Sequence, residues 1–264
     1  MSACLALEQP LHIGFLGPQG PFTQAAALKH FGHSVQTQAF GAIPDVFREV
    51  ESGGCTYGVV PVENSTEGVV SHTLDMFLSS PLCICGEVML RVNHNLMTAG
   101  AGLESLRTVY SHQQSFAQCR GWLDRHLPHA ERVPVGSNAE AARRAREVPH
   151  AAAIAGETAA EIYGLSLLVR NIEDEPGNTT RFLVIGRQRV PPSGSDKTSL
   201  LLAARNEAGS LYRLLSPLAE HGISMTRIES RPSRRGIWEY VFFVDVEGHQ
   251  DDEHVAKALG ALRR

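Results

Sequence analysis

The segment LHIGFLGPQGPFTQAAALKHF, residues 11–31, holds a complete strand–loop–helix unit. Leu11 to Leu16 is a short apolar run of the kind that forms a buried strand. The turn residues Gly17-Pro18-Gln19-Gly20 end that run, and Phe22 to Phe31 has the pattern of a helix. A strand that opens into a helix through a short polar loop is the building unit of α/β folds.

The same order recurs along the first two thirds of the chain. Further strands are predicted at Tyr57 to Val62, Thr108 to Ser111 and Ala151 to Ala155. A helix follows each of these strands. The first ends at Phe77, the second spans Gln114 to Leu127, and the third spans Glu157 to Tyr163. The repetition predicts an α/β fold with a largely parallel sheet. Ligands in such folds bind outside the carboxyl ends of the strands, and two sheets facing one another would put the polar loops in a shared cleft.

Composition excludes several classes of protein. The chain has 264 residues, a formal charge of −4 and a pI near 6.3, which argues against nucleic-acid binding. No apolar run approaches the roughly 18 residues of a membrane span, and Met1 to Pro10 lacks the basic start of a signal peptide. Five scattered cysteines without a zinc-ligand spacing predict a cytoplasmic protein with reduced thiols.

A second domain is predicted after a linker. Val190 to Lys197 is rich in Pro, Gly and Ser and has no apolar periodicity. Beyond it we expect a strand, a helix, two strands and a helix, at 198–205, 210–221, 223–229, 238–246 and 251–262. This βαββα order is that of a ferredoxin-like domain without its last strand.

Polar side chains cluster where the predicted strands of the first domain end. In Glu63-Asn64-Ser65-Thr66-Glu67-Gly68, Asn64 is either a site residue or the N-cap of the next helix, with Glu67 as its capping-box partner. Ser111-His112-Gln113-Gln114 repeats the arrangement, and Gln118 lies one helical turn beyond Gln114. His112 is a candidate general acid or base, although a lone His is more often packed or solvated.

The richest polar segment is Asn178-Thr179-Thr180-Arg181-Phe182, which enters a strand that continues to Gly186. Two hydroxyls beside a guanidinium suit a small anionic substrate. The alternative is a Thr-rich strand entry with a surface Arg. Two other features favour a structural interpretation. The loop at 17–20 lacks nucleotide-binding patterns and is either an anion site or a tight turn before Thr23, and Arg143, Arg144 and Arg146 are expected on the solvated face of an Ala-rich helix.

Five segments together resemble the prephenate dehydratase family with a C-terminal ACT regulatory domain. They are GPQGPFTQAA (17–26), VVPVENSTEGVVSHTLD (59–75), YSHQQSFAQC (110–119), NTTRFLVIG (178–186) and ESRP (229–232). Residues 1–8 also resemble the end of the chorismate mutase domain in proteobacterial bifunctional chorismate mutase–prephenate dehydratases. We therefore expect a fragment of such a protein, cut on both sides.

The resemblance implies a fold and a domain division. The fold expected is α/β, with a two-lobed, periplasmic-binding-protein-like catalytic domain followed by the ferredoxin-like ACT domain. The divisions are a remnant at 1–10, the dehydratase domain at 11–190 with its second lobe at about 94–168, a linker at 191–197 and a truncated ACT domain at 198–264.

The resemblance also implies a reaction. Prephenate loses CO2 and water to give phenylpyruvate on the way to phenylalanine, and no cofactor or metal is needed because aromatisation drives the step. Thr180 corresponds to the essential Thr of the family and is assigned as the hydrogen-bond donor to the leaving hydroxyl. Asn64, Ser111 and Gln118 match its other polar site residues. Ser65, Thr66, Thr179 and Arg181 are weaker candidates for substrate binding.

The implied effector is L-phenylalanine. Its pocket in such enzymes lies between ACT domains of neighbouring subunits, so a homodimer or dimer of dimers is expected. The matching residues are Gly209, Ser210 and Leu211 in a turn, and Glu229, Ser230, Arg231 and Pro232 in the ESRP motif. Three positions depart from the family pattern: Pro21 replaces a Thr, Gln113 a Pro and Ser210 an Ala.

Two other functions fit the same residues. The first is dehydration of arogenate, which carries an amine where prephenate has a ketone. The second is a two-lobed protein that binds a small molecule without catalysis. The missing export signal and the attached ACT domain argue against the binding protein.

Overall fold

The computed structural model describes residues 11–17, 22–204, 207–233 and 240–262. The chain divides into two compact units, Met1–Gln188 and Arg189–Arg264. The loop at 18–21, with the departure at Pro21, lies outside the described residues. Within the described segments, no helix has the length and apolar character needed to cross a membrane.

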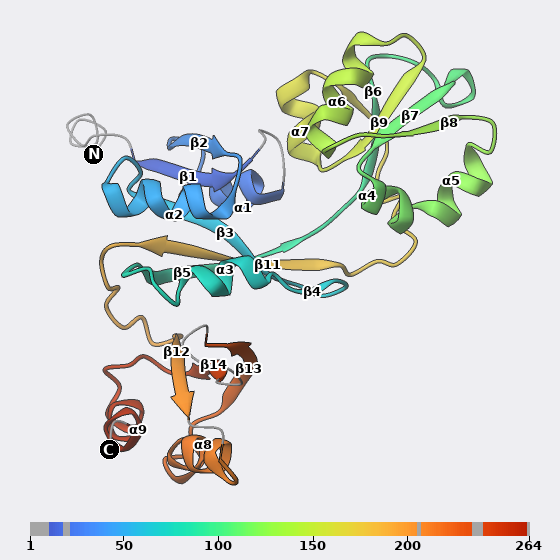
Figure 1. Cartoon of the computed structure of the whole chain (residues 1–264). Helices are drawn as coiled ribbons and strands as arrows, with labels where there is room; N and C mark the ends of the chain where they lie inside the picture. Colours follow the sequence, from blue (N-terminus) through green and yellow to red (C-terminus); the bar gives the residue numbers. More distant parts are fainter. Residues whose placement is uncertain (1–10, 18–21, 205–206, 234–239, 263–264) are drawn as a thin grey trace. The chain divides into compact units, whose positions relative to one another are not determined.

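The first lobe of the first unit is built on a mixed sheet of strand order β2-β1-β3-β11-β5, with β4 paired to β3 (Figure 1). Its strands are β1 (His12–Leu16), β2 (Gln36–Phe40), β3 (Tyr57–Asn64), β4 (Gly68–Val69), β5 (Cys83–Arg91) and β11 (Thr179–Gly186). Its helices are α1 (Phe22–Phe31), α2 (Ile43–Ser52) and α3 (Ser71–Met76).

Alternation along the strands explains why helices cover both faces of this sheet. Val59 of β3 and Phe182 of β11 share a cluster with Ala26 and Ala27 of α1. A Cβ built at Gly58, the neighbour of Val59, would lie 2.8 Å from a methyl group of Val46 in α2. Successive residues of a strand point to opposite faces, so α1 and α2 pack on opposite sides of the sheet.

The second lobe has the strand order β10-β6-β9-β7-β8. Its strands are β6 (Asn95–Thr98), β7 (Thr108–Ser111), β8 (Glu131–Pro134), β9 (Ala151–Ala155) and β10 (Ser166–Val169). Its helices are η2 (Leu103–Ser105), α4 (Gln113–Gln118), α5 (Arg120–His126), α6 (Asn138–Glu147) and α7 (Glu157–Tyr163). Every residue of β9 is buried, because helices cover both faces.

The expectation of largely parallel sheets was wrong, since both sheets are mixed. In the first, β11 runs antiparallel to both β3 and β5. In the second, β6 runs antiparallel to β9 and β10. The physical reason is the connection between the lobes: the chain leaves the first lobe after β5, and β11 brings it back in the opposite direction.

Two segments link the lobes and are paired with each other. Residues 92–94 lead from β5 to β6, and residues 170–178 lead from β10 to β11. The N–H of Val92 donates to the carbonyl of Asn178 at 2.8 Å, and the N–H of Ile172 donates to the carbonyl of His94 at 2.8 Å. Polar residues of both segments therefore lie side by side where the lobes meet.

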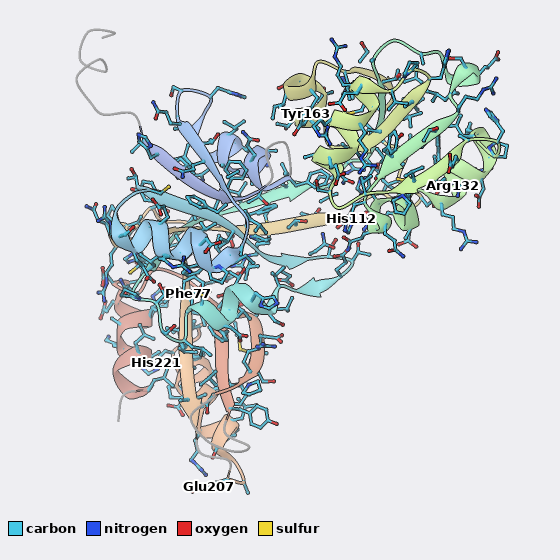
Figure 2. The ribbon with its side chains drawn as sticks, turned by 45° about the horizontal axis from the view of Figure 1, so that its top comes forward. Phe77, His112, Arg132, Tyr163, Glu207 and His221 are labelled. Atoms are coloured by element: carbon cyan, nitrogen blue, oxygen red, sulfur yellow. The ribbon has the colours of Figure 1, made fainter. Side chains whose placement is uncertain are left out.

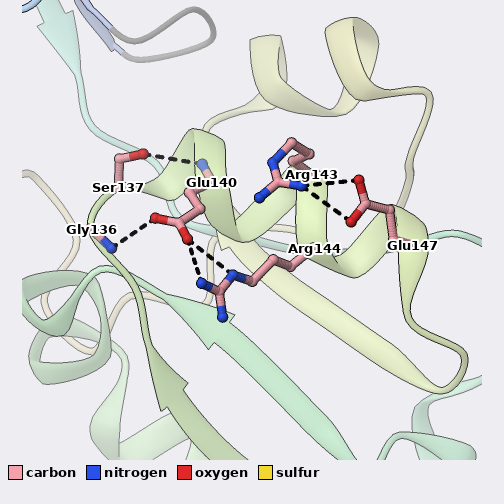
Figure 3. A network of polar contacts seen from close by, with 6 residues as sticks. All are labelled: Gly136, Ser137, Glu140, Arg143, Arg144 and Glu147. Atoms are coloured by element: carbon pink, nitrogen blue, oxygen red, sulfur yellow. Dashed lines mark hydrogen bonds and ion pairs between the residues drawn. The ribbon is translucent and has the colours of Figure 1, made fainter.

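The arginines of α6 lie on its solvated face, as the Ala-rich pattern predicts. Glu140 binds Arg144 at 2.6 Å and accepts from the N–H of Gly136 (Figure 3). The Arg144 guanidinium lowers the pKa of the Glu140 carboxyl. Ser137 caps the helix through the N–H of Glu140. These contacts fix the first turn of α6, where Asn138 lies.

The second unit has the predicted βαββα order. Its elements are β12 (Lys197–Ala204), α8 (Ser210–Glu220), β13 (Met225–Pro232), β14 (Tyr240–Glu247) and α9 (Glu253–Leu262). The three strands form an antiparallel sheet of order β12-β14-β13. Residues 238 and 239 of the predicted third strand lie outside the described residues. Together with the two α/β lobes, this order confirms the predicted fold class.

Candidate active site at the junction of the lobes

Asn64 and Thr180 form the centre of a polar network at paired positions of β3 and β11. The side-chain amide Nδ2 of Asn64 donates to Thr180 Oγ1 at 2.8 Å and to Asn178 Oδ1 at 2.7 Å. The Thr180 side chain is 8% exposed. Because Asn64 supplies a donor to the Thr180 oxygen, the hydroxyl proton of Thr180 remains available for another acceptor.

The orientation of the Asn64 amide is fixed by the backbone. Its Oδ1 accepts from the N–H groups of Thr66 and Glu67, at 2.9 and 3.1 Å. A backbone N–H can only donate, so the carbonyl side of the amide must face it and Nδ2 must face Thr180. The sequence alternative of Asn64 as a helix cap was wrong. Asn64 caps the β3–β4 turn, which Gly68 closes with a φ of 84°, while α3 begins only at Ser71.

Gln118 joins the network from the second lobe. Its Oε1 lies 2.6 Å from His94 Nε2 and accepts from Asn178 Nδ2 at 3.5 Å, and its Nε2 donates to Glu67 Oε1 at 3.4 Å. Three of the four residues predicted to carry the chemistry, Asn64, Gln118 and Thr180, are therefore linked through Asn178. These three residues come from three separate elements, β3, α4 and β11.

The position of Gln118 depends on a break in the helix predicted at 114–127. The structure divides it into α4 and α5 at Cys119. The carboxylate of Asp174 accepts from the N–H groups of Gly121 and Trp122, at 2.7 and 2.8 Å, and so caps α5. The N–H of Asp174 donates to the carbonyl of Gln118 at 2.7 Å. A residue of the return segment therefore ends one helix at Gln118 and starts the next.

Ser111 lies in a different network from Thr180. Its side chain is 0% exposed, and its hydroxyl lies 3.1 Å from Asn138 Oδ1 and 3.2 Å from the carbonyl of Ile154. Asn138 Oδ1 also accepts from the N–H of His112. These bonds hold Ser111 beneath the start of α4, and its convergence with Asn64, Gln118 and Thr180 stays a prediction. His112, labelled in Figure 2, caps α4 by accepting from the N–H of Gln114.

Arg181 does not point toward Thr180. Neighbouring strand residues face opposite sides of a sheet, and the guanidinium of Arg181 pairs with Glu87 at 2.7 Å. Its side chain is 11% exposed, and the pair compensates its charge. We therefore do not retain Arg181 as an anion-binding residue.

The remaining substrate-binding candidates support the backbone around Thr180. Ser65 and Thr179 are tied together: the N–H of Ser65 donates to the carbonyl of Thr179, and the N–H of Thr179 donates to Ser65 Oγ, both at 2.9 Å. Thr66 is exposed and touches the network through its N–H. These contacts fix β11 at the point where it presents Thr180.

Sequence reasoning assigned no site role to three residues that the structure brings to this junction. His94 and Asn178 belong to the linking segments, and Phe22 begins α1. The Phe22 and His94 rings form a T-shaped pair with centroids 5.9 Å apart. The polar run Asn93-His94-Asn95 before an apolar strand was a detectable signal. The position of Phe22 had no signal, because only the folded chain brings α1 to the second lobe.

The surroundings of His94 change the pKa of its imidazole. Its side chain is 2% exposed, and burial lowers its pKa against the opposing effects of the Gln118 hydrogen bond and the Glu173 carboxylate. The N–H of His94 donates to Glu173 Oε2 at 3.0 Å. The imidazole is therefore neutral at pH 7, since a lowered pKa lies below its ordinary value near 6.5.

Two other features do not form part of the candidate site. A cavity of about 360 Å³ is lined by Thr56, Tyr57, Arg187 and Gln188, at the end of β3 opposite to Asn64. Among the residues that the structure describes, no group of three or more His, Cys, Asp or Glu side chains is placed to hold a metal ion. The cysteines Cys55, Cys83, Cys85 and Cys119 are free thiols.

The predicted effector residues lie on two elements of the second unit. Gly209 is the N-cap residue of α8 and has a φ of 80°, and Ser210 and Leu211 begin that helix. The ESRP residues Glu229, Ser230, Arg231 and Pro232 form the end of β13, an edge strand of the sheet. Within β13 the exposure alternates, with Ser230 and Pro232 exposed.

Comparisons with known proteins identify relatives for both units. The sequence model described as prephenate dehydratase matches residues 13–190, and that of the ACT domain matches residues 198–264. The bifunctional chorismate mutase/prephenate dehydratase of Stutzerimonas stutzeri is 56% identical over 98% of this chain and 71% of its own length. The prephenate dehydratase of Mycobacterium marinum is 39% identical over 96% of this chain and 84% of its own length.

Solved structures share the fold. A prephenate dehydratase from Arthrobacter aurescens in complex with L-Phe has a TM-score of 0.86 and 33% identity, covering 96% of this chain and 86% of that one. A structure described as GqqA, a novel type of quorum quenching acylase, has a TM-score of 0.86 and 32% identity, covering 95% of this chain and 92% of that one.

Proposed function

The chain belongs to the prephenate dehydratase family and carries an ACT domain, and from this premise we propose that it converts prephenate to phenylpyruvate. In this reaction the ring carboxylate leaves as CO2, its electron pair enters the ring, and the ring hydroxyl leaves with one proton as water. The charge of the substrate dianion falls from −2 to −1. Aromatisation drives the step, and the reaction needs no cofactor.

The observation that supports the proposal is the bond from Asn64 to Thr180. The reaction needs a proton donor for the leaving hydroxyl, and Thr180 has its proton free because its oxygen accepts from Asn64 Nδ2 at 2.8 Å. A hydrogen bond received by the oxygen also strengthens the one that the same hydroxyl donates. Thr180 then acts by positioned hydrogen bonding to the departing oxygen.

We assign Asn64 as the residue that orients Thr180, and Gln118 as a further substrate contact. Gln118 Nε2 donates to the Glu67 carboxylate at 3.4 Å, so it is a donor that an oxygen of the substrate can take over. Ser111 enters the proposal as a positioning residue for the start of α4, because its side chain is buried.

An acylase activity is the second candidate, because of the similarity to GqqA. Hydrolysis of an acyl group through a hydroxyl nucleophile requires a base that removes the hydroxyl proton. The partner of Thr180 in the described structure is the Asn64 Nδ2 group, which donates and takes no proton. The geometry at Thr180 therefore favours the dehydratase.

The test is phenylpyruvate formation from purified prephenate by the full chain, with arogenate as a parallel substrate. The variant Asn64→Asp is assayed beside the wild type, because it keeps the shape of the side chain but replaces the Nδ2 donors with an acceptor. We expect wild-type turnover of prephenate and a loss of about 10²–10³ in the variant, the usual effect of removing a preorganised donor. If the chain converted arogenate but not prephenate, the assigned substrate would be arogenate. If it converted neither compound, the proposed function would be refuted.

We further propose that L-phenylalanine binds the second unit and inhibits the enzyme, which acts as a cytoplasmic homodimer. Support comes from the L-Phe complex of the Arthrobacter aurescens relative and from exposed apolar residues of this unit, among them Tyr212 at 77% and Met225 at 41%. The N-terminal end of α8, with the partial positive charge of the helix dipole, suits the effector carboxylate. Cytoplasmic residence accords with the free thiols.

Gly209 gives the test of this regulation. Its φ of 80° is strained for a β-branched residue, and a Cβ there would lie 3.3 Å from Arg213 Nη1. We expect calorimetry to show phenylalanine binding to the wild-type chain and none to Gly209→Val, with prephenate turnover retained. Unchanged binding in the variant would place the effector elsewhere, and a monomer in sedimentation would refute the dimer.

A further inference from the structure

His94 lies in the segment that connects the two lobes, and nothing in the reaction above uses it. Its ring is buried, with the Phe22 ring nearly perpendicular to it and Nε2 directed at Gln118. The 2.6 Å distance between Nε2 and Gln118 Oε1 is shorter than the usual length of about 2.9 Å for such a bond. A neutral imidazole has one donor and one acceptor nitrogen, so the direction of this bond defines its tautomer.

The direction follows from the rest of the network. Asn64 is fixed by two backbone N–H groups, so its Nδ2 donates to Asn178 Oδ1. The other side of the Asn178 amide, Nδ2, then donates to Gln118 Oε1. Glu67 accepts from Gln118 Nε2, which leads to the same orientation of the Gln118 amide. Gln118 Oε1 therefore accepts, and His94 Nε2 must donate to it.

The other nitrogen of His94 agrees with this assignment. Nδ1 is a buried atom without a hydrogen-bond partner within the described part of the chain, as is Glu173 Oε1. A buried N–H without an acceptor costs more than a buried lone pair without a donor, because nitrogen donors are rarely left unpaired. The proton on Nε2 thus satisfies the stronger demand, and Nδ1 carries the lone pair.

We propose that His94 is a positioning residue for the dehydration. Its Nε2 donates to the side-chain oxygen Oε1 of Gln118 and so holds the Gln118 Nε2 group toward the substrate. Without this donor the Gln118 amide is held only by the longer bonds to Asn178 and Glu67, at 3.5 and 3.4 Å. A rotation by 180° then becomes easier, and it would present the amide oxygen to an anionic substrate instead of the N–H groups. The role rests on the proposed function, because Gln118 has a substrate to bind only if the reaction is the one assigned.

Two matched amide variants separate positioning from packing. In His94→Gln the side-chain nitrogen falls near the position of Nε2, whereas in His94→Asn it falls near that of Nδ1. We expect His94→Gln to keep kcat/KM within about threefold of wild type, and His94→Asn to lose about tenfold or more, the cost of one buried hydrogen bond. Equal losses in the two variants, with equal melting temperatures, would overturn the role.

A double-mutant cycle with Gln118→Ala tests whether His94 acts through Gln118. If it does, Gln118→Ala should cost almost nothing further in the His94→Asn background, since the amide is already misplaced. Losses that multiply would show that the two residues act independently and would overturn the proposal.

The tautomer is measurable without any turnover. Nitrogen NMR of the ¹⁵N-labelled full chain, with His94→Gln to assign the ring, should show protonated Nε2 and unprotonated Nδ1 at pH 7. Prephenate turnover combined with an Nδ1–H tautomer would overturn the role of His94. An Nε2–H tautomer in a chain that turns over no prephenate would instead refute the proposed function and, with it, the use of this bond in catalysis.

Discussion

Replacing Thr180 by Val tests the chemistry of the candidate site directly. Val has nearly the same shape and lacks the hydroxyl, so the change removes one donor without opening a cavity. We expect kcat for phenylpyruvate formation to fall by about 10²–10³, the usual effect of losing one preorganised donor to the transition state. Thr180→Ser should retain part of the activity, because the hydroxyl remains but the methyl that restricts its rotamer is lost.

The cost to stability should be small, and the structure says why. In Thr180→Val, Asn64 Nδ2 loses one acceptor but keeps Asn178 Oδ1 at 2.7 Å. Asn64 is only half-buried, so water can reach the freed N–H. The penalty therefore lies near the low end of the range for an unpaired polar group, about 1 kcal/mol. For a chain of this size that corresponds to a fall in Tm of about 2–4 °C.

The matched control is Thr98→Val in the second lobe. Thr98 is buried like Thr180, and its hydroxyl donates to the carbonyl of Ala151 at 2.9 Å. It lies outside the network at the junction, so its variant should lose stability but keep kcat. Progress curves of phenylpyruvate formation and thermal melts of all four proteins give the comparison. If Thr180→Val turned over prephenate as fast as wild type, or if Thr98→Val lost as much activity, the assignment of Thr180 would be wrong.

The remaining predictions concern stability and reactivity. Asp174→Ala should lower the free energy of unfolding by about 1 kcal/mol, the usual cost of a lost helix cap. It should also reduce kcat, because α4 no longer ends in place. Urea unfolding and kinetics check this, and an unchanged unfolding curve would show that Asp174 does not stabilise α5. Burial raises the pKa of the Cys119 thiol, so it should stay unreactive toward a disulfide reagent at pH 8 until the protein unfolds, and rapid labelling of the native chain would contradict the packing. Burial lowers the pKa of His94 below its ordinary value of 6.5, so the unfolded chain binds the proton more readily. Its contribution to stability should be complete above pH 6.5 and be lost as the pH falls through the lowered folded pKa. The dependence of Tm on pH in this range should therefore be weaker in His94→Gln. An identical dependence in that variant would mean that His94 does not titrate in this way.

The helices and strands near the predicted motifs were readable because their patterns are local. The strand–loop–helix unit at 11–31 and the βαββα order after residue 197 follow from apolar periodicity and turn residues. The direction of the strands was not readable, because it depends on β11 returning from the other lobe. The break at Cys119 was missed because it also depends on a distant residue: the Asp174 carboxylate that caps α5 is more than 50 residues away in the sequence.

The sequence by itself determined which residue types are present at the strand ends, and from them a small anionic substrate; the choice of Thr180 as donor came from the family resemblance. Only the tertiary structure decided which of those side chains meet. It linked Asn64, Gln118 and Thr180 through Asn178, buried Ser111 and paired Arg181 with Glu87. It also brought in His94, whose tautomer follows through Asn64, Asn178 and Gln118 from backbone N–H groups of the first lobe. Local patterns specify a side chain's chemistry, but its hydrogen-bond partners come from distant segments, and a donor or acceptor acquires its direction only when those partners are in place.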